Sequence, residues 1–225
     1  MTERSSWDEC VTRSNYHFNP QRKDVLEDMI KLHGSIYPTW TNLMTQIIHN
    51  ARPATWETRG YKGDGNPIPS DDLAAEEYDI ARVGGDPKAV ISHLNWEIPP
   101  LLQGISDMFG LDDMMTRIHV QLPGEVWHRH IDKLHKWCPR EPWRVKRIFI
   151  HLTDWQPGQF WEMGNHHYQH WSAGDVFSFD WGDIPHCTAN AGHHPRVTLQ
   201  LTGISTRRTD TFLRGLRQHM VVHNV

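Results

Sequence analysis

From residue 116 onward the chain alternates between apolar and polar residues with a period of two, which is typical of strands with one apolar face. In each of three segments, 117–122, 147–152 and 196–201, three aliphatic residues alternate with three other residues. Those other residues are mostly capable of hydrogen bonding, so their face is suited to lining a ligand pocket. Shorter strands, separated by turn residues, are expected at three more places: 160–161, Trp171 and 176–179.

The first half of the chain instead carries apolar residues at helical spacing. Apolar stripes occur within 25–32 and within 39–50. A third helical region spans 87–109, where Pro99 and Pro100 either break the helix or begin it afresh. The sequence therefore predicts that residues 1–110 form mainly helical support.

Two further segments complete the predicted secondary structure. Residues 60–71 are dense in glycine, proline and aspartate and are expected to form a loop. That loop could be an active-site lid or an ordinary surface loop, and the sequence leaves both open. Near the C-terminus, Thr209 and Asp210 can cap a helix over 209–222 whose apolar residues pack on the domain.

Together these elements predict an α+β protein that forms a single domain over residues 1–225. We expect residues 115–203 to form a jelly-roll core of two facing sheets. The apolar strand faces would bury the helical stripes, and the polar faces would line the inside of the barrel. The N-terminal helices and the C-terminal helix would support this core.

Composition and charge narrow the function classes. Hydrophobic residues make up 38% of the 225 residues, with 11 Trp and 7 Phe, so a substantial core can form. The net charge is −4 and no basic block stands out, so a nucleic-acid partner is not expected. Cys10, Cys138 and Cys187 form neither a paired framework nor a CxxC site, which favours a reducing compartment. With no apolar leader or membrane-length segment in sight, we expect a cytoplasmic protein without a membrane partner.

Four residues form a candidate site, although some of them lie far apart in the sequence. His130 and Asp132 lie one residue apart, His186 follows far downstream, and Arg196 comes ten positions after His186. Two imidazoles and one carboxylate can occupy one face of an iron(II) ion and leave the opposite face open. An arginine beyond the second histidine could bind a dicarboxylate through a bidentate pair.

His128 offers a competing ligand set. The pair His128 and His130 is similar to the start of a cupin metal site, which next requires a glutamate three or four residues later. Lys133 and Leu134 stand there instead, which favours His130 with Asp132. Other histidines are expected in exposed loops: His166, His167, His170, His193 and His194.

An ordered set of motifs resembles that of the iron(II)- and 2-oxoglutarate-dependent oxygenases, and most closely the aspartyl/asparaginyl and prolyl hydroxylase branch. The resemblance covers about residues 115–203 and implies that their jelly-roll is a cupin-like double-stranded β-helix. Its motifs are Gln121-Leu-Pro-Gly-Glu, His130-x-Asp132, Arg147-x-x-x-His151-Leu, Trp171-x-x-Gly-Asp-Val, His186-x-x-x-Asn190 and Arg196.

The resemblance implies a role for each motif residue. Iron(II) would be bound by His130, Asp132 and His186. The co-substrate 2-oxoglutarate would be bound by Arg196, His151, Thr198 and Gln121. Substrate contacts are expected from Arg147, Trp137 and Asn190. The chain departs from the branch at Phe149, where an arginine is usual, and Arg147 stands two residues earlier. The insertion 133–144 is expected to form part of the substrate pocket.

The reaction implied by the resemblance consumes O2 and 2-oxoglutarate and releases succinate and CO2. It would hydroxylate an unactivated C–H bond of an amino-acid side chain, either free or within a protein. Desaturation is also compatible with the motifs, whereas Asp132 argues against halogenation, in which a halide takes the place of the carboxylate. The alternative is a cupin-like metal-binding protein, an isomerase-type enzyme or a small-ligand binding module, without oxidative turnover.

Overall fold

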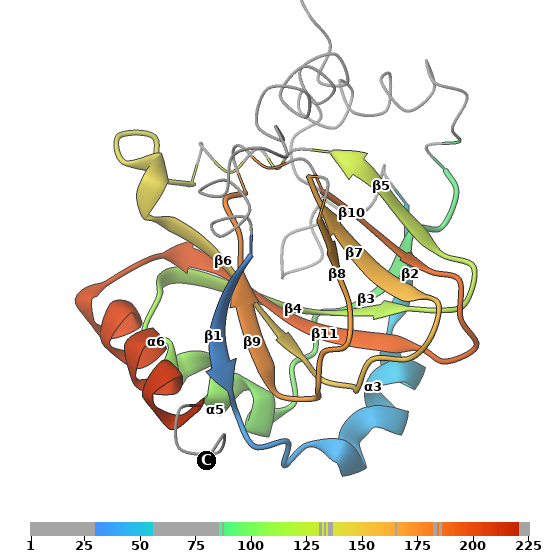
Figure 1. Ribbon diagram of the computed structural model, residues 1–225, viewed down its shortest axis with the longest axis horizontal. Coiled ribbons are helices and arrows are strands. Elements are labelled where there is room, and N and C mark those ends of the chain that lie inside the picture. The colour runs from blue at the N-terminus through green and yellow to red at the C-terminus, as the bar shows by residue number, and fades with distance from the viewer. Residues whose placement is uncertain are drawn as a thin grey trace, which may run out of the picture.

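The computed structural model describes residues 30–55, 86, 88–130, 132, 134, 137–164, 166–181, 184 and 186–220, without the side chains of 217–220. Within these residues two antiparallel sheets face each other, and helices cover the outer side of the larger one (Figure 1). No helix in this part of the chain combines the length and apolar character needed to cross a membrane.

The larger sheet has seven strands in the order β1-β9-β6-β11-β4-β3-β2. Their bounds in chain order are β1 Lys31–Ser35, β2 Arg52–Ala54, β3 Ser92–Asn95, β4 Asp112–Gln121, β6 Val145–His151, β9 Asp175–Ser178 and β11 Arg196–Ile204. The smaller sheet has four strands in the order β5-β10-β7-β8. Their bounds are β5 Val126–His130, β7 Gln159–Met163, β8 His166–Tyr168 and β10 His186–Asn190.

The connections between the strands define the fold. From β4 to β11 the chain passes back and forth between the two sheets, with the hairpin β7–β8 as the one consecutive pair within a sheet. β4, β6, β9 and β11 lie in the larger sheet, while β5, β7, β8 and β10 lie in the smaller one. This alternation is the topology of a double-stranded β-helix, so the predicted α+β jelly-roll fold is confirmed.

The helices pack on the outer face of the larger sheet (Figure 1). They comprise η1 (Thr41–Leu43), α3 (Met44–Asn50), α5 (Pro100–Met108) and α6 (Arg207–Met220); a further short turn, η3 (Pro142–Arg144), precedes β6. Trp40, Leu102 and Phe109 are fully buried against the strands, where the apolar residues of the predicted alternation form one cluster with them. The apolar strand faces therefore bury the helices, as expected.

The helix predictions hold in part. The helix expected within 39–50 is present as η1 and α3. The helical region expected over 87–109 is wrong in its first half, where Ser92–Asn95 forms β3. Its second half is present as α5, which begins at Pro100, where proline suits the first turn. The C-terminal helix begins at Arg207 rather than at Thr209.

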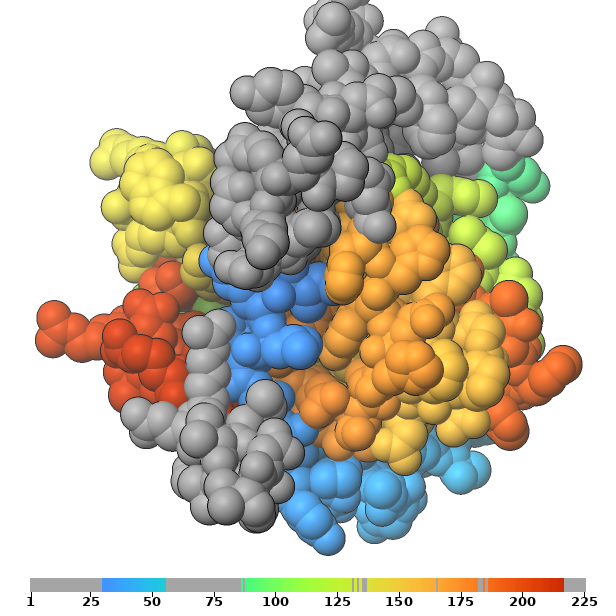
Figure 2. All heavy atoms as spheres, in the orientation of Figure 1, coloured from blue at the N-terminus to red at the C-terminus, as the bar shows by residue number. Residues whose placement is uncertain are grey.

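Three strands before residue 96 correct the prediction of mainly helical support. The helix was expected within 25–32, and the structure describes only the last residues of this range. There the prediction is wrong, because Lys31–Ser35 forms β1 and pairs with β9. β2 and β3 extend the opposite edge of the sheet next to β4. Figure 2 shows the blue residues that include β1 against the orange surface of the later strands. Open sheet edges offer backbone hydrogen bonds, and these outweigh a short helical pattern. The loop expected at 60–71 lies outside the described residues.

The strand expected at Trp171 is also not present. Trp171 lies in the loop between β8 and β9, not in a strand, and its ring stacks on His151 with centroids 4.2 Å apart. His166 and His167 are exposed as expected, but they belong to β8. The remaining histidines predicted to be exposed loop residues are so: His170, His193 and His194.

Candidate metal centre

Two histidines and one aspartate converge between the two sheets. His130 ends β5, Asp132 follows it in a loop, and His186 begins β10. The ligand atoms that these residues can offer lie within 4.8 Å of one another. Nε2 of His130 lies 3.5 Å from Oδ1 of Asp132, and Nε2 of His186 lies 3.7 Å from Oδ2. The three residues expected to bind a metal are thus brought together in an arrangement that could hold one ion.

A β-bulge in β5 aims His130 into the barrel. His186 of β10 pairs with His130. Two residues further along β10, Thr188 pairs with Trp127, which lies three residues from His130. The extra residue shifts the alternation, so Trp127 and His130 line the same pocket. In a regular strand His128 and His130 would share a face, but His128 is not part of the metal-ligand cluster.

Backbone carbonyls set the tautomer of both candidate histidine ligands. Nδ1–H of His130 donates to the carbonyl oxygen of His128 at 2.7 Å. Nδ1–H of His186 donates to the carbonyl oxygen of Ile184 at 3.0 Å. Each ring therefore keeps the lone pair of Nε2 for the side facing Asp132, as metal-binding histidines do. Burial lowers the pKa of His186 to about 3, so this ring is neutral at pH 7.

A buried ion pair supports the carboxylate of the triad. Arg147 of β6 donates a hydrogen bond from its guanidinium to Oδ2 of Asp132, and both side chains are buried. Nε–H of Arg147 also donates to Oγ1 of Thr202 at 3.3 Å. Burial by itself raises the pKa of Asp132, but Arg147 and the two histidines outweigh it and hold the pKa well below its usual range. Asp132 is therefore ionised, which metal binding requires.

Polar side chains from three adjacent strands form the floor of the pocket. β11 lies between β4 and β6, and its register places three residues side by side at each level. Successive levels contain His119, Thr198 and His151, and then Arg117, Gln200 and Phe149. Arg196 lies at one end of this grid, opposite Gln121, and Arg147 lies at the other end, opposite Thr202. The predicted inward face of the three strands thus supplies six residues of the pocket lining: Arg117, His119, Arg147, Phe149, Arg196 and Gln200. Thr198 and His151 are fully buried and do not line the pocket themselves.

Arg196 lies beside the ring of Trp161 at its end of the pocket. Its guanidinium is 5.0 Å from the ring centroid of Trp161 and donates to the carbonyl oxygen of Phe160 at 3.3 Å. Burial lowers the pKa of Arg196 to about 9, which leaves it protonated at pH 7. Both ring nitrogens of His151 and Oγ1 of Thr198 are buried without a hydrogen-bond partner among the described residues. Orphaned polar atoms beside a buried cation fit a carboxylate ligand.

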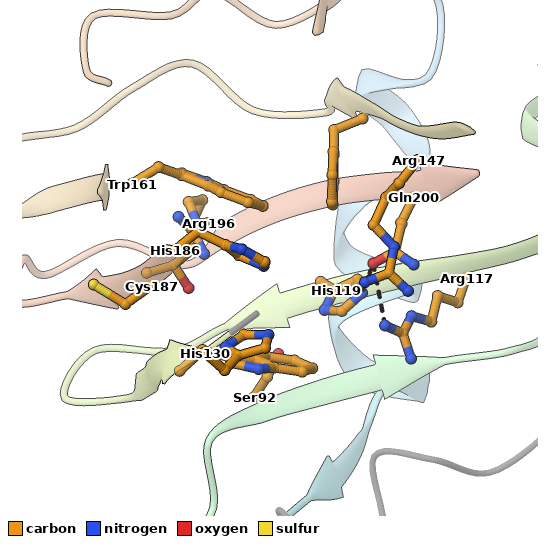
Figure 3. A pocket seen from close by; sticks show the side chains of 13 residues that line it. Ser92, Arg117, His119, His130, Arg147, Trp161, His186, Cys187, Arg196 and Gln200 are labelled. Atoms are coloured by element: carbon orange, nitrogen blue, oxygen red, sulfur yellow. Dashed lines mark hydrogen bonds between the residues drawn. The ribbon is translucent and has the colours of Figure 1, made fainter. Parts of the chain in front are cut away.

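A second polar cluster lies at the opposite end of the pocket (Figure 3). Oε1 of Gln200 accepts hydrogen bonds from Arg117 at 3.2 Å and from Nε2–H of His119 at 2.8 Å. Burial lowers the pKa of His119 well below its usual value, and Arg117, Arg147 and Arg196 lower it further. His119 is therefore a neutral ring within a positive environment.

Three expected binding residues make hydrogen bonds within the protein and are not among the residues that line the pocket. Nε2–H of Gln121 donates to Oγ1 of Thr188 at 3.2 Å, and its remaining oxygen is an acceptor that would repel a carboxylate. Asn190 donates to the carbonyl oxygens of Gln121 and His194, so it stabilises a turn. Trp137 donates to the carbonyl oxygen of Asp113 and, like the rest of the described insertion, does not line the pocket. Its expected part in a substrate pocket is not seen.

The pocket is also lined by residues to which the sequence assigned no binding role. They are Arg117, His119, Trp127, Trp161 and Gln200. The strand alternation places Arg117, His119 and Gln200 on the polar face, so a signal was present for these three. The position of Trp127 depends on the bulge, which no local sequence pattern indicates.

Fold and site together define a double-stranded β-helix protein with a candidate His-Asp-His metal centre. No family model matches the sequence, and no curated protein matches it. Solved structures do match. A prolyl-4-hydroxylase from Pseudomonas putida is 20% identical with a TM-score of 0.40, and the match covers 62% of this chain and 89% of that one.

Two further solved structures illustrate the spread of the matches. A Cupin 2 conserved barrel domain protein from Salinispora arenicola CNS-205 is 14% identical, with a TM-score of 0.32 and coverage of 54% of this chain and 82% of that one. A predicted oxalate decarboxylase from Thermotoga maritima is 12% identical, with a TM-score of 0.33 and coverage of 50% and 80%. At these values the likenesses do not decide among the activities that those names state.

Proposed function

We propose that the protein is an iron(II)- and 2-oxoglutarate-dependent dioxygenase that hydroxylates a C–H bond of an amino-acid side chain. The observation that carries this proposal is the triad of His130, Asp132 and His186. It offers two Nε2 lone pairs and an ionised carboxylate at one point of the pocket. Such a set would leave several coordination positions of an iron(II) ion open to other ligands.

The residues around Arg196 support 2-oxoglutarate as co-substrate. Arg196 would bind the distal carboxylate of 2-oxoglutarate through charge-assisted hydrogen bonds. Oγ1–H of Thr198 and one N–H of the neutral His151 ring are further donors without partners among the described residues. This donor set fits a carboxylate better than a neutral ligand, because a buried arginine requires a counter-charge.

When bound, iron(II) and 2-oxoglutarate would supply the oxidising power for hydroxylation, with O2 consumed and succinate and CO2 released. The chain's own residues hold and orient the reacting groups. Arg147 keeps Asp132 ionised and in place. Phe149, Trp161 and Trp127 line the pocket and exclude water from it.

Oxygen-dependent succinate formation tests the proposal. The metal-free protein is loaded anaerobically with iron(II) and 2-oxoglutarate, O2 is admitted, and succinate is measured with and without a mixture of free amino acids or cellular protein. We expect succinate in the wild type and none in His186→Ala, with mass spectrometry showing a gain of one oxygen atom in the substrate.

The same experiment separates the oxygenase from a cupin-like metal-binding protein. The latter would bind metal through the triad but form no succinate. Absence of succinate, together with 2-oxoglutarate binding that is unaffected by Asp132→Ala and Arg196→Ala, would overturn the proposed function.

A further inference from the structure

We propose that the substrate carries a carboxylate that binds at the Arg117 end of the pocket, while Arg196 serves 2-oxoglutarate. This assignment rests on the proposed function and deepens it by naming the chemistry of the substrate. The carboxylate could belong to a free amino acid or other small acid, or to an acidic side chain of a peptide.

Arg117 is held in place as a binding residue would be. Its side chain is buried, and its NH2 group donates to Gln200 at 3.2 Å. The guanidinium lies 5.7 Å from the ring centroid of Trp96 and 6.0 Å from that of Trp127. Flanking rings restrict the planar guanidinium to few orientations, which lowers the entropy cost of binding a carboxylate.

The Arg117 cluster is too far from Arg196 to serve the same ligand. Arg117 pairs in register with Gln200, which lies four residues from Arg196 along β11. At about 3.3 Å per residue, the backbone positions of Gln200 and Arg196 are roughly 13 Å apart. Figure 3 shows Arg117, His119 and Gln200 on one side of the pocket and Arg196 on the other. A five-carbon diacid held by Arg196 and by a metal would leave the Arg117 end to another molecule.

The charges in the pocket favour an anion there. Arg117, Arg147 and Arg196 line it, and none of its described lining residues is an Asp or Glu. Asp132 offsets Arg147, and the distal carboxylate of 2-oxoglutarate would offset Arg196. Among the described residues the positive charges therefore outnumber the negative ones. Burial, and then Arg117, Arg147 and Arg196, lower the pKa of His119. A substrate carboxylate would offset that surplus in a site of low dielectric.

Acetate and acetamide are matched probes for this site. They have nearly the same shape, and only acetate carries the charge. The holoprotein is prepared with zinc(II) in place of iron(II) and with saturating 2-oxoglutarate, so that no turnover occurs. Each probe is then titrated to 100 mM while the imidazole resonances of His119 are followed by NMR. We expect saturable shifts with acetate, and binding of acetamide at least about tenfold weaker.

Variants assign the effect to Arg117. Arg117→Gln should abolish the preference for acetate, while the exposed Arg140→Gln, which also removes one arginine, should leave it unchanged. Gln200→Glu places a carboxylate beside Arg117 and should block acetate by occupying its partner. This second variant decides the matter if Arg117→Gln does not fold. Equal binding of the two probes, no saturation with acetate, or an unchanged preference in Gln200→Glu would overturn the proposal.

The outcome is distinguishable from failure of the proposed function. Bound 2-oxoglutarate without an acetate site would reject the carboxylate proposal alone. Arg117-dependent acetate binding in a protein that does not bind 2-oxoglutarate would reject the dioxygenase alone. Succinate assays then compare free amino acids with acidic peptides that are blocked at both ends. Stimulation by the first group indicates a small acid as substrate, and stimulation by the second indicates a protein side chain; stimulation only by uncharged compounds contradicts the proposal.

Discussion

Arg147 and Asp132 form a buried ion pair that joins the floor of the larger sheet to the candidate metal centre. Arg147 is fixed in turn by Thr202 of β11, so the carboxylate position is tied to two central strands. Asp132 itself lies in the loop after β5, where its backbone N–H donates to the carbonyl oxygen of Trp181. A loop residue thereby acquires the rigidity that a metal ligand requires.

A double-mutant cycle measures this ion pair in the metal-free protein. Arg147→Met leaves Asp132 buried without its cation and should lower the free energy of unfolding by about 3–5 kcal/mol. Asp132→Asn leaves Arg147 without its anion and should lower the free energy of unfolding by a similar amount. The double variant should lose less than the sum of the two, because neither charge is then left unpaired. Urea denaturation checks the cycle, and strictly additive losses would show that the pair makes no such contribution.

Metal-induced stabilisation should depend on the triad and not on His128. At a hundredfold excess of metal over its Kd, the wild type should gain about 2.7 kcal/mol in the free energy of unfolding. His186→Ala and Asp132→Ala should lose most of that gain, since each removes one ligand. His128→Ala should keep it, because the bulge leaves this residue out of the ligand cluster. Thermal unfolding with cobalt(II) is a suitable measurement; loss of the gain in His128→Ala would instead indicate a cupin-type ligand set.

Arg196→Ala should separate co-substrate binding from metal binding. Loss of a charge-assisted bidentate contact is expected to raise the Kd for 2-oxoglutarate by about 10–100-fold, equivalent to about 1.4–2.7 kcal/mol. The Kd for cobalt(II) should change by less than about threefold, because Arg196 is not a candidate ligand. Isothermal titration calorimetry measures both constants. An unchanged affinity for 2-oxoglutarate would remove Arg196 from its assigned role.

Buried neutral histidines should make the metal-free fold sensitive to mild acid. Burial and then Arg196 lower the pKa of His151, so its folded-state pKa lies below that of the unfolded chain, about 6.5. The stabilisation from this group is complete above pH 6.5 and is lost as the pH falls toward the folded-state pKa. The free energy of unfolding should therefore fall by up to about 1.4 kcal/mol per pH unit for each such histidine.

Substitution of His151 isolates its share of that pH dependence. In His151→Gln the decline in stability between pH 6.5 and pH 5 should be shallower than in the wild type by about the contribution of one histidine. His49→Gln, at an exposed position in α3, should leave the decline as it is. Urea titrations at several pH values measure the slopes. Identical slopes in His151→Gln and the wild type would mean that this ring does not remain neutral in the fold.

The inward and outward faces of the central strands were predictable because their period is a local property. Val197, Leu199 and Leu201 alternate with Thr198 and Gln200, and either face can be recognised without knowing the partner strand. The edge strands were not predictable in the same way. Residues 31–35 carry only two buried positions, and their extended backbone is set by the free edge of β9. Such a segment takes its conformation from its neighbour.

The sequence by itself indicated a jelly-roll core, the polar lining of its interior and three candidate metal ligands. These follow from strand periodicity and from the order of a few residue types, both of which are written along the chain. The tertiary structure alone decided that a bulge aims His130 rather than His128 inward, that Arg147 belongs to Asp132, and that Arg117 and Gln200 share a cluster. Those relationships depend on register between strands that are distant in sequence, and register is settled only when the sheets assemble.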